Sequence, residues 1–207
     1  VEVVLPQGAR PSDAAAFIRK HATWVVEQIT FFRRAGRHIL RPRHGLPTTI
    51  LFHGRSTHLT IVHDDFAKRS GGIEDLGHTL RVRLPNFEAI EPLKVLQGWL
   101  RKRAKEAIHA RVAERSREMR RRPGRIYIMD QRTKWGGCSR RRNLSFNWRL
   151  VMAPPAVLDY IIVHELAHLA EPRHSAKFWL IVRSYSPSYP RQKEWLRQKQ
   201  ETLRSAI

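Results

Sequence analysis

A short segment in the last quarter of the chain most constrains its fold. Residues 163–179 read VHELAHLAEPRHSAKFW and place His164, Glu165 and His168 in the order H-E-x-x-H. Residues four apart lie one turn apart on the same face of an α-helix, so His164 and His168 can direct imidazole nitrogens at one ion. The pattern therefore predicts a helix here, with a metal site that the rest of the fold must enclose.

His174 is the predicted third ligand. Pro172 cannot continue the helix, so the chain should turn between Leu169 and His174 and bring His174 back toward the ion. A catalytic zinc has three protein ligands and keeps its fourth position for water. We therefore predict Zn²⁺ as the cofactor, His164, His168 and His174 as its ligands, and Glu165 as the general base that takes the water proton.

The residues before the motif indicate a buried helix. Pro154 and Pro155 suit its first turn, where proline is tolerated. Several apolar residues then give the same helix a broad apolar surface: Val157, Leu158, Ile161, Ile162, Leu166 and Leu169. A five-residue H-E-x-x-H pattern alone also occurs as a solvated or core-packed histidine pair, but this setting favours a metal site.

The charge balance leaves the choice of partner open. The 207 residues contain 39 Lys and Arg against 18 Asp and Glu, a formal charge of +21. Nucleic acid, an acidic protein or an anionic membrane surface could respond to that charge, or the arginines could only solvate helix faces. The single cysteine, Cys138, allows no intrachain disulfide and suggests a reducing, cytoplasmic compartment. We expect no membrane span and no signal peptide.

Periodicity predicts two regions, 1–90 and 91–207. The first contains a helix at about 14–34, and its expected strands are residues 1–6, 48–54, 56–63 and 79–85, with a hairpin around Gly54. The second begins with a long helix from Pro92 to about Arg120. Strands at 125–130 and 143–150, a loop at 133–139, and helices from Ser175 and over 191–205 complete it.

The outer face of the long helix is strongly basic. Residues 101–125 contain eleven Lys and Arg against three Glu, and Arg140, Arg141 and Arg142 form a second basic run. These segments are the first and second candidates for contact with nucleic acid, and the alternative is a solvated helix face. Aromatic residues that would stack on bases are not interleaved with the charges.

Longer motifs make the chain resemble a known family. TKWGGCS, NWRLVMAPP, DYIIVHELAHL and HSAKFW are similar to segments of the YgjP-like zinc metallopeptidases, which are related to the SprT-like group, and the resemblance extends over most of the chain. It implies an α+β, zincin-like metallopeptidase domain with a small sheet over the H-E-x-x-H helix, preceded by an N-terminal β-containing segment. It also implies a peptide or protein substrate, the three histidine ligands and the Glu165 base.

Two departures qualify the resemblance. The family's usual Thr-Arg-Trp-Gly-Ser-Cys has Lys134 and Gly137 at its second and fifth positions here.

The spacing from His164 to His174 also matches metzincins, but Glu171 replaces their turn glycine and no methionine follows Met152. A true metzincin is therefore rejected.

The predicted reaction is hydrolysis of peptide bonds by a zinc-bound water, by an endopeptidase rather than an exopeptidase. We expect the 143–148 strand to be a sheet edge to which substrate adds as a strand, with Ser145, Asn147 and Trp135 as substrate-binding residues. Cys138 is an additional metal ligand, a cysteine switch or, as free cysteines usually are, a small buried residue. The alternative function is a nucleic-acid-associated protein, either a SprT-like protease acting on DNA-bound proteins or a binding module with a structural zinc.

Overall fold

The computed structural model describes residues 46–64, 70–86 and 90–207, together with Ala22, Thr23 and Val26. Backbone contacts divide the chain into residues 1–41 and 42–207, and the elements below all belong to the second unit. The strand predicted at 1–6 lies outside the described residues. Of the helix predicted at 14–34, only Ala22, Thr23 and Val26 are described, and they are helical. The predicted region boundary near residue 90 stays a prediction.

The first half of this unit contains a four-stranded sheet of order β1-β2-β4-β3. Its strands are β1 (Thr49–Phe52), β2 (Arg55–His63), β3 (Gly72–Asp75) and β4 (Thr79–Leu84). β1 and β2 form the predicted hairpin, whose turn has positive φ at His53 and Gly54. β3 was not predicted, because its polar, glycine-bearing sequence lacks strand alternation. It pairs antiparallel with β4 along its whole length.

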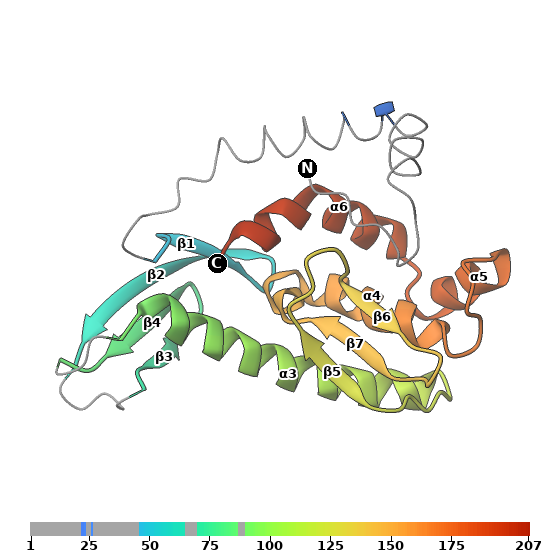
Figure 1. The fold of residues 1–207 in the computed structure, drawn as a ribbon, viewed down its shortest axis with the longest axis horizontal. Helices are drawn as coiled ribbons and strands as arrows, with labels where there is room; N and C mark the ends of the chain where they lie inside the picture. Colours follow the sequence, from blue (N-terminus) through green and yellow to red (C-terminus); the bar gives the residue numbers. More distant parts are fainter. Residues whose placement is uncertain (1–21, 24–25, 27–45, 65–69, 87–89) are drawn as a thin grey trace, which may run out of the picture. The chain divides into compact units, whose positions relative to one another are not determined.

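The long helix α3 (Pro92–Glu118) begins at Pro92 as predicted. Its buried face repeats every four residues, at Leu96, Leu100, Ala104, Ile108 and Val112. The helix ends at Glu118 because Met119 caps it and Arg120 adopts a positive φ of 50°. In Figure 1, α3 runs past both sheets, and it contacts β3 and β4 near its start and β5 farther along.

The three-stranded sheet differs from the sequence expectation in two ways. Its order is β5-β7-β6, formed by β5 (Ile126–Met129), β6 (Gly136–Cys138) and β7 (Leu144–Asn147). Gly136 and Gly137 were expected in a loop but form a strand, because their backbone pairs antiparallel with β7, a long-range contact that local glycine preference does not indicate. The expectation that 143–148 is an edge is wrong, since β7 is the central strand.

β7 is also shorter than predicted. The Asn147 side chain accepts a hydrogen bond from the Arg149 amide at 2.9 Å and so caps a short 3₁₀ helix, η1 (Trp148–Met152). The residues of η1 other than Arg149 are buried. They lead directly into α4 (Pro155–Ala167), which carries the H-E-x-x-H motif.

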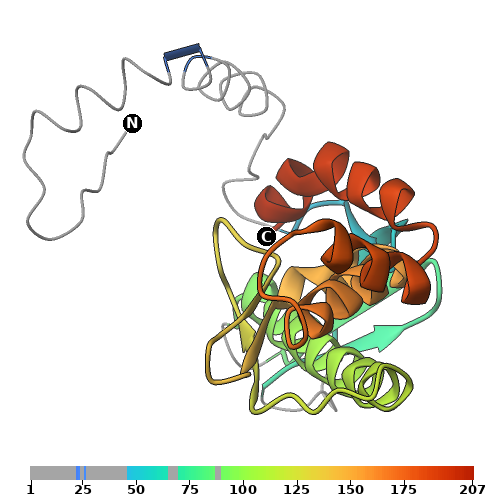
Figure 2. The same ribbon diagram turned by 90° about the vertical axis from the view of Figure 1, so that its right-hand side faces the viewer.

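Helix α4 is the centre of the second half of the unit. It contacts α3 on one side and α6 (Tyr189–Ser205) on the other, while α5 (Ala176–Tyr185) follows it through a turn (Figures 1 and 2). β6 lies against it from the sheet. This is the predicted α+β architecture with a small sheet over the motif helix. No helix in the described ranges is long and apolar enough to cross a membrane.

Candidate active site

Local hydrogen bonds position the three motif histidines. His164 lies in the last turn of α4, and His168 caps that helix with its amide directed at the His164 carbonyl, 3.3 Å away. Beyond the cap, the Glu171 amide bonds to the Ala167 carbonyl at 3.0 Å and begins the predicted turn. Ser175 then caps α5 by accepting from the Phe178 amide at 3.3 Å. The turn brings His174 back against His164.

The three imidazoles converge on one point. Each ring offers a nitrogen within 4.8 Å of the others, and the Nε2 atoms of His164 and His174 are 3.0 Å apart. His168 Nδ1 lies 3.2 Å from the Glu171 carbonyl oxygen. When this nitrogen donates its proton to the carbonyl, Nε2 of His168 keeps a free lone pair, which is the form that binds a metal.

The chemistry of this set fits a metal ion. Burial, followed by the neighbouring His168 and His174, lowers the pKa of His164 to about 3. Burial also lowers the pKa of His168. Both rings are therefore neutral near pH 7, as ligands must be. Two nitrogens bound to one tetrahedral zinc at about 2.05 Å lie about 3.3 Å apart. The His164 and His174 nitrogens, 3.0 Å apart, come near this value, and all three ligand atoms lie within 4.8 Å of one another.

Glu165 lies beside this cluster in a buried position, with 5% of its surface exposed. Burial raises the pKa of its carboxyl to about 8, and the nearby Lys134 ammonium opposes that rise. The carboxyl lies directly against β6: a Cβ added to Gly136 would be 2.7 Å from Glu165 Oε1. A side chain at residue 136 would thus occupy the space that the carboxylate fills. A cation held by the histidines would favour the carboxylate form and lower this pKa.

Aromatic residues that the sequence analysis did not single out surround the histidines. Phe178 is fully buried, and its ring centroid lies 4.9, 4.6 and 4.7 Å from those of His164, His168 and His174. Trp179 stacks on His174 at 5.8 Å. Tyr160 meets His164 edge-on at 5.9 Å. Its position four residues before His164, on the same helix face, was a usable sequence signal.

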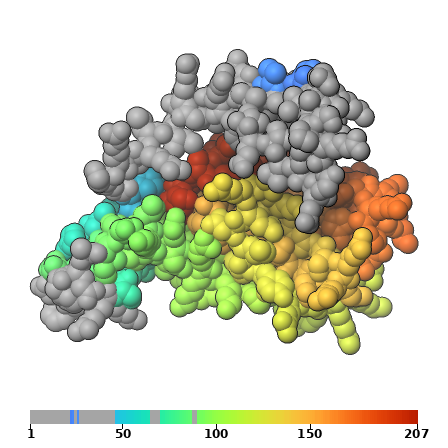
Figure 3. Space-filling view, viewed as in Figure 1, coloured from blue at the N-terminus to red at the C-terminus, as the bar shows by residue number. Residues whose placement is uncertain are grey.

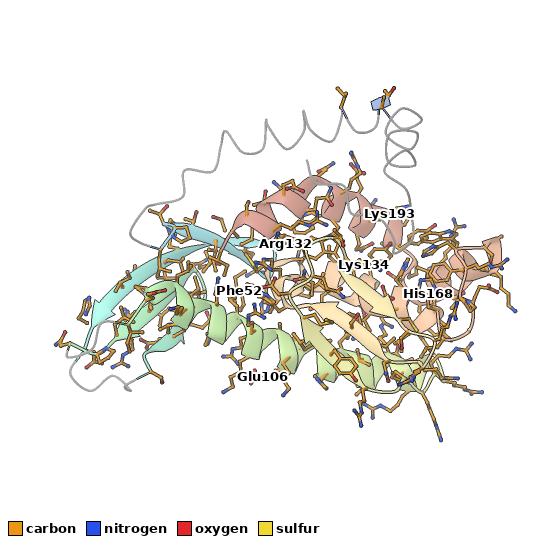
Figure 4. The ribbon with its side chains drawn as sticks, in the orientation of Figure 1. Phe52, Glu106, Arg132, Lys134, His168 and Lys193 are labelled. Carbon is orange, nitrogen blue, oxygen red and sulfur yellow. The ribbon has the colours of Figure 1, made fainter. Side chains whose placement is uncertain are left out.

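Two lysines approach the cluster from different elements. Lys134 precedes β6 and acts on Glu165, and Lys193 on α6 lies 5.1 Å from the Trp179 ring. Figure 4 labels both lysines and His168, each on a separate segment. The site therefore combines one buried acid with a positively charged surrounding.

The predicted substrate residues lie next to β6 with internal hydrogen bonds. The Asn147 side-chain amide donates to the Gln131 carbonyl at 2.6 Å. The backbone amide of Asn147 donates to the Trp135 carbonyl at 2.9 Å. Ser145 Oγ donates to the Gly137 carbonyl at 3.4 Å. Their role in substrate binding stays a prediction. Cys138 is not part of the histidine cluster, and burial raises the pKa of its thiol.

A buried glutamate and two histidines on or capping a helix beneath a small sheet, with a third histidine returned by the following turn, define the class of zincin-like metallopeptidases. The sequence matches the YgjP-like metallopeptidase domain over residues 1–199, and the chain belongs to the YgjP-like family. A comparison with curated proteins gives no match. Among solved structures, the chain is similar to the metallopeptidase zymogen jannalysin of Methanocaldococcus jannaschii, with 25% identity and a TM-score of 0.41 over 45% of this chain and 96% of that chain.

Membership of this family makes the protein a metallopeptidase with a peptide or protein substrate. A metallopeptidase requires a metal, typically zinc, and the histidine cluster is the group of side chains in the described ranges that is suited to hold it. The predictions of the family, the fold class and the peptidase class are therefore confirmed.

Proposed function

We propose that the protein is a zinc-dependent endopeptidase whose metal is held by His164, His168 and His174 and whose general base is Glu165. One observation carries the proposal: three imidazoles, two of them kept neutral by burial, converge beside a buried carboxyl. Zinc bound there would lower the pKa of water toward about 7 and polarise the scissile carbonyl.

Glu165 moves the proton in this proposal. An oxygen of its carboxylate accepts a proton from the attacking water and then gives it to the nitrogen of the leaving amine. Burial disfavours the charged form and so strengthens the carboxyl as a proton acceptor, while a cation held by the histidines would keep it ionised and able to accept. The close contact with Gly136 limits the movement of the carboxyl, so the acceptor atom is held in place before substrate arrives.

The proposed substrate track is the free edge of β6. β7 hydrogen-bonds to only one side of β6 within the described ranges, so the Gly136–Cys138 backbone can pair with an extended peptide. β6 also lies against α4, which carries the histidines. An edge strand binds the middle of a chain without requiring a terminus, and this supports an endopeptidase. The single cysteine supports a reducing, cytoplasmic compartment.

The test compares the native chain with Glu165→Gln. Bound metal is measured by elemental analysis, and cleavage is measured on an unfolded protein substrate. We expect about one zinc per chain in both proteins and a loss of activity of roughly 10²- to 10⁴-fold in the variant. Glu106→Gln is the matched control, because Glu106 is exposed and pairs only with Arg103 on α3.

Two results would contradict the proposal. Equal activity of Glu165→Gln and the native chain would exclude Glu165 as the base. A native chain that binds no metal when purified without chelator, and remains active, would exclude the histidine site.

A further inference from the structure

Eight arginines from two separate segments form one surface, which we name the arginine cluster. Its members are Arg117, Arg120, Arg121, Arg122, Arg125, Arg140, Arg141 and Arg142. Backbone contacts join the segments: the Gly124 amide bonds to the Arg142 carbonyl at 2.8 Å, and the Arg125 amide bonds to Asn143 Oδ1 at 2.9 Å. The Arg142 guanidinium also donates to the Arg122 carbonyl at 3.1 Å. The two basic runs of the sequence are thus neighbours in the fold.

The cluster differs from the basic residues earlier on α3. There, Arg101, Arg103, Arg111 and Arg115 each form an ion pair with a carboxylate, at 2.5 to 3.3 Å. Within the described ranges, no arginine of the cluster forms an ion pair with a carboxylate. Among the described residues, arginines without an ion pair are therefore concentrated at the end of α3, although Lys102 and Lys105 earlier on the helix also form none. An anionic partner would reduce the repulsion among the clustered arginines.

An open groove of about 920 Å³ lies at the α3 side of the cluster. It is lined by Arg117, Arg120, Arg121 and Arg122 together with Ser116 and residues of the neighbouring segments. The Ser116 hydroxyl oxygen and Arg121 Nε are buried and have no hydrogen-bond partner. Arg Nε–H needs an acceptor, and a serine hydroxyl can donate a proton. Neither atom is exposed, so a phosphate in this groove would meet the exposed guanidinium groups of Arg120 and Arg122 first.

An exposed aromatic residue lies on the strand that leaves the cluster. β5 begins directly after Arg125, and its Tyr127 and Met129 are 44% and 41% exposed. Tyr127 pairs with Ser145 on β7, whose other neighbour is Gly137 on β6, so small residues adjoin the tyrosine on this face. In Figure 3, the yellow atoms of this part of the chain face the viewer. Such a ring can stack on an unpaired base.

We infer that the arginine cluster and Tyr127 bind single-stranded nucleic acid, with phosphates on the arginines and a base on the tyrosine. Every cation of the cluster is arginine, whose planar guanidinium matches a phosphate with two N–H donors. An anionic membrane attracts lysine and arginine in the same way, as surface charges. The combination of arginines without carboxylate partners and an exposed ring therefore favours nucleic acid.

The test measures binding of labelled single strands and duplexes of about 20 nucleotides to the full chain by fluorescence anisotropy over a salt series. The test variant is Arg122→Gln with Arg141→Gln, which removes one exposed arginine from each segment. The control is Lys102→Gln with Lys105→Gln, which makes the same charge change at exposed positions on α3 without breaking an ion pair. Tyr127→Ala tests stacking, and vesicles with anionic lipids test membrane binding.

We expect affinity for single strands to fall linearly with log salt for the native chain. Loss of two phosphate contacts should weaken binding roughly 25-fold near 0.1 M salt, since each contact contributes a factor of about 5. Tyr127→Ala should weaken strand binding roughly tenfold and leave duplex binding unchanged. The control variant should bind as the native chain does.

Three outcomes would overturn the inference. These are no binding of nucleic acid, equal losses in the test and control variants, or binding to vesicles in place of nucleic acid. Peptidase activity on a protein substrate should be unchanged in the test variant, so failure of this inference is separate from failure of the proposed function.

Discussion

The Glu165 carboxyl lies so close to the Gly136 backbone that a methyl group on residue 136 would come within 2.7 Å of Oε1. The same methyl group would lie 2.8 Å from Glu165 Cγ, so rotation of the carboxyl alone cannot relieve the clash. Gly136→Ala should therefore displace Glu165 and lower kcat by about 10²-fold, while zinc content stays near one per chain. Steady-state cleavage of a peptide, together with elemental analysis, measures both.

Gly137→Ala is the control for this clash. A methyl group on Gly137 would meet Ser145 Oγ at 3.1 Å, and that hydroxyl can rotate away. Gly137→Ala should therefore keep most of the activity. Equal losses in the two variants would mean that alanine disturbs β6 itself, and the contact with Glu165 would not be the cause.

His174→Ala should remove one of the three proposed metal ligands. His174 is exposed, so the substitution should leave the fold intact. We expect metal affinity to fall by more than about 100-fold. Loss of a residue that only hydrogen-bonds to a metal ligand lowers metal affinity by about 10- to 100-fold, and loss of a ligand itself should cost more. Competition with a chromophoric zinc chelator measures the change. His109→Ala, at an exposed position on α3, should bind zinc as the native chain does, and a similar loss there would argue against the histidine cluster.

Phe178 should matter for both stability and metal binding, because its ring contacts all three imidazoles and is fully buried. Phe178→Ala should lower the free energy of unfolding of the metal-free protein by about 3 to 5 kcal/mol. Phe178→Leu fills more of the space and should cost less than about 2 kcal/mol. Denaturant titrations in a chelator give both values. Equal costs would show that Phe178 is not tightly enclosed.

Asp159 should make stability depend on acid pH. Burial alone would raise the pKa of its carboxyl, but hydrogen bonds from Arg115 and Arg111 outweigh burial and lower it below the usual value. Because the folded pKa lies below the unfolded pKa of about 3.9, the contribution is fully present above that value. It is lost as pH falls through the folded pKa.

Thermal unfolding of Asp159→Asn tests this. At pH 7 the variant should be less stable by about 2 to 3 kcal/mol, because Arg111 and Arg115 lose a charged acceptor. The gap between the variant and the native chain should shrink below pH 4. Glu106→Gln should change stability by less than about 1 kcal/mol at any pH, since its ion pair is exposed. A constant gap down to pH 2 would contradict the assignment.

The helices were the most predictable part of the fold. Pro92, Pro155 and Ser175 mark helix starts that the structure confirms, because proline and serine act locally at the first turn. β6 could not be predicted in this way. Gly136 and Gly137 have low intrinsic strand preference, and their strand depends on pairing with β7, while the packing of Glu165 leaves no room for a side chain at Gly136.

The histidine cluster was predictable because His164 and His168 are one helical turn apart in sequence. Only the return of His174 depends on a further feature, the turn that follows α4. The position of β7 and the meeting of Arg122 with Arg142 depend on pairings between distant segments, which periodicity cannot specify. Asp159 illustrates the same limit. Its sequence neighbours predict only a helix, yet it binds two arginines from another helix.

An open β6 edge also exposes backbone groups that a second copy of the chain could bind. Unpaired strand edges are templates for aggregation, and proteins protect them with charged side chains, lysine above all. Lys134 and Arg140 are exposed and flank β6 at its two ends. Two such edges in antiparallel register would bring like charges together, whereas a peptide without those charges would meet no repulsion. The edge can thus remain open to substrate while resisting self-assembly.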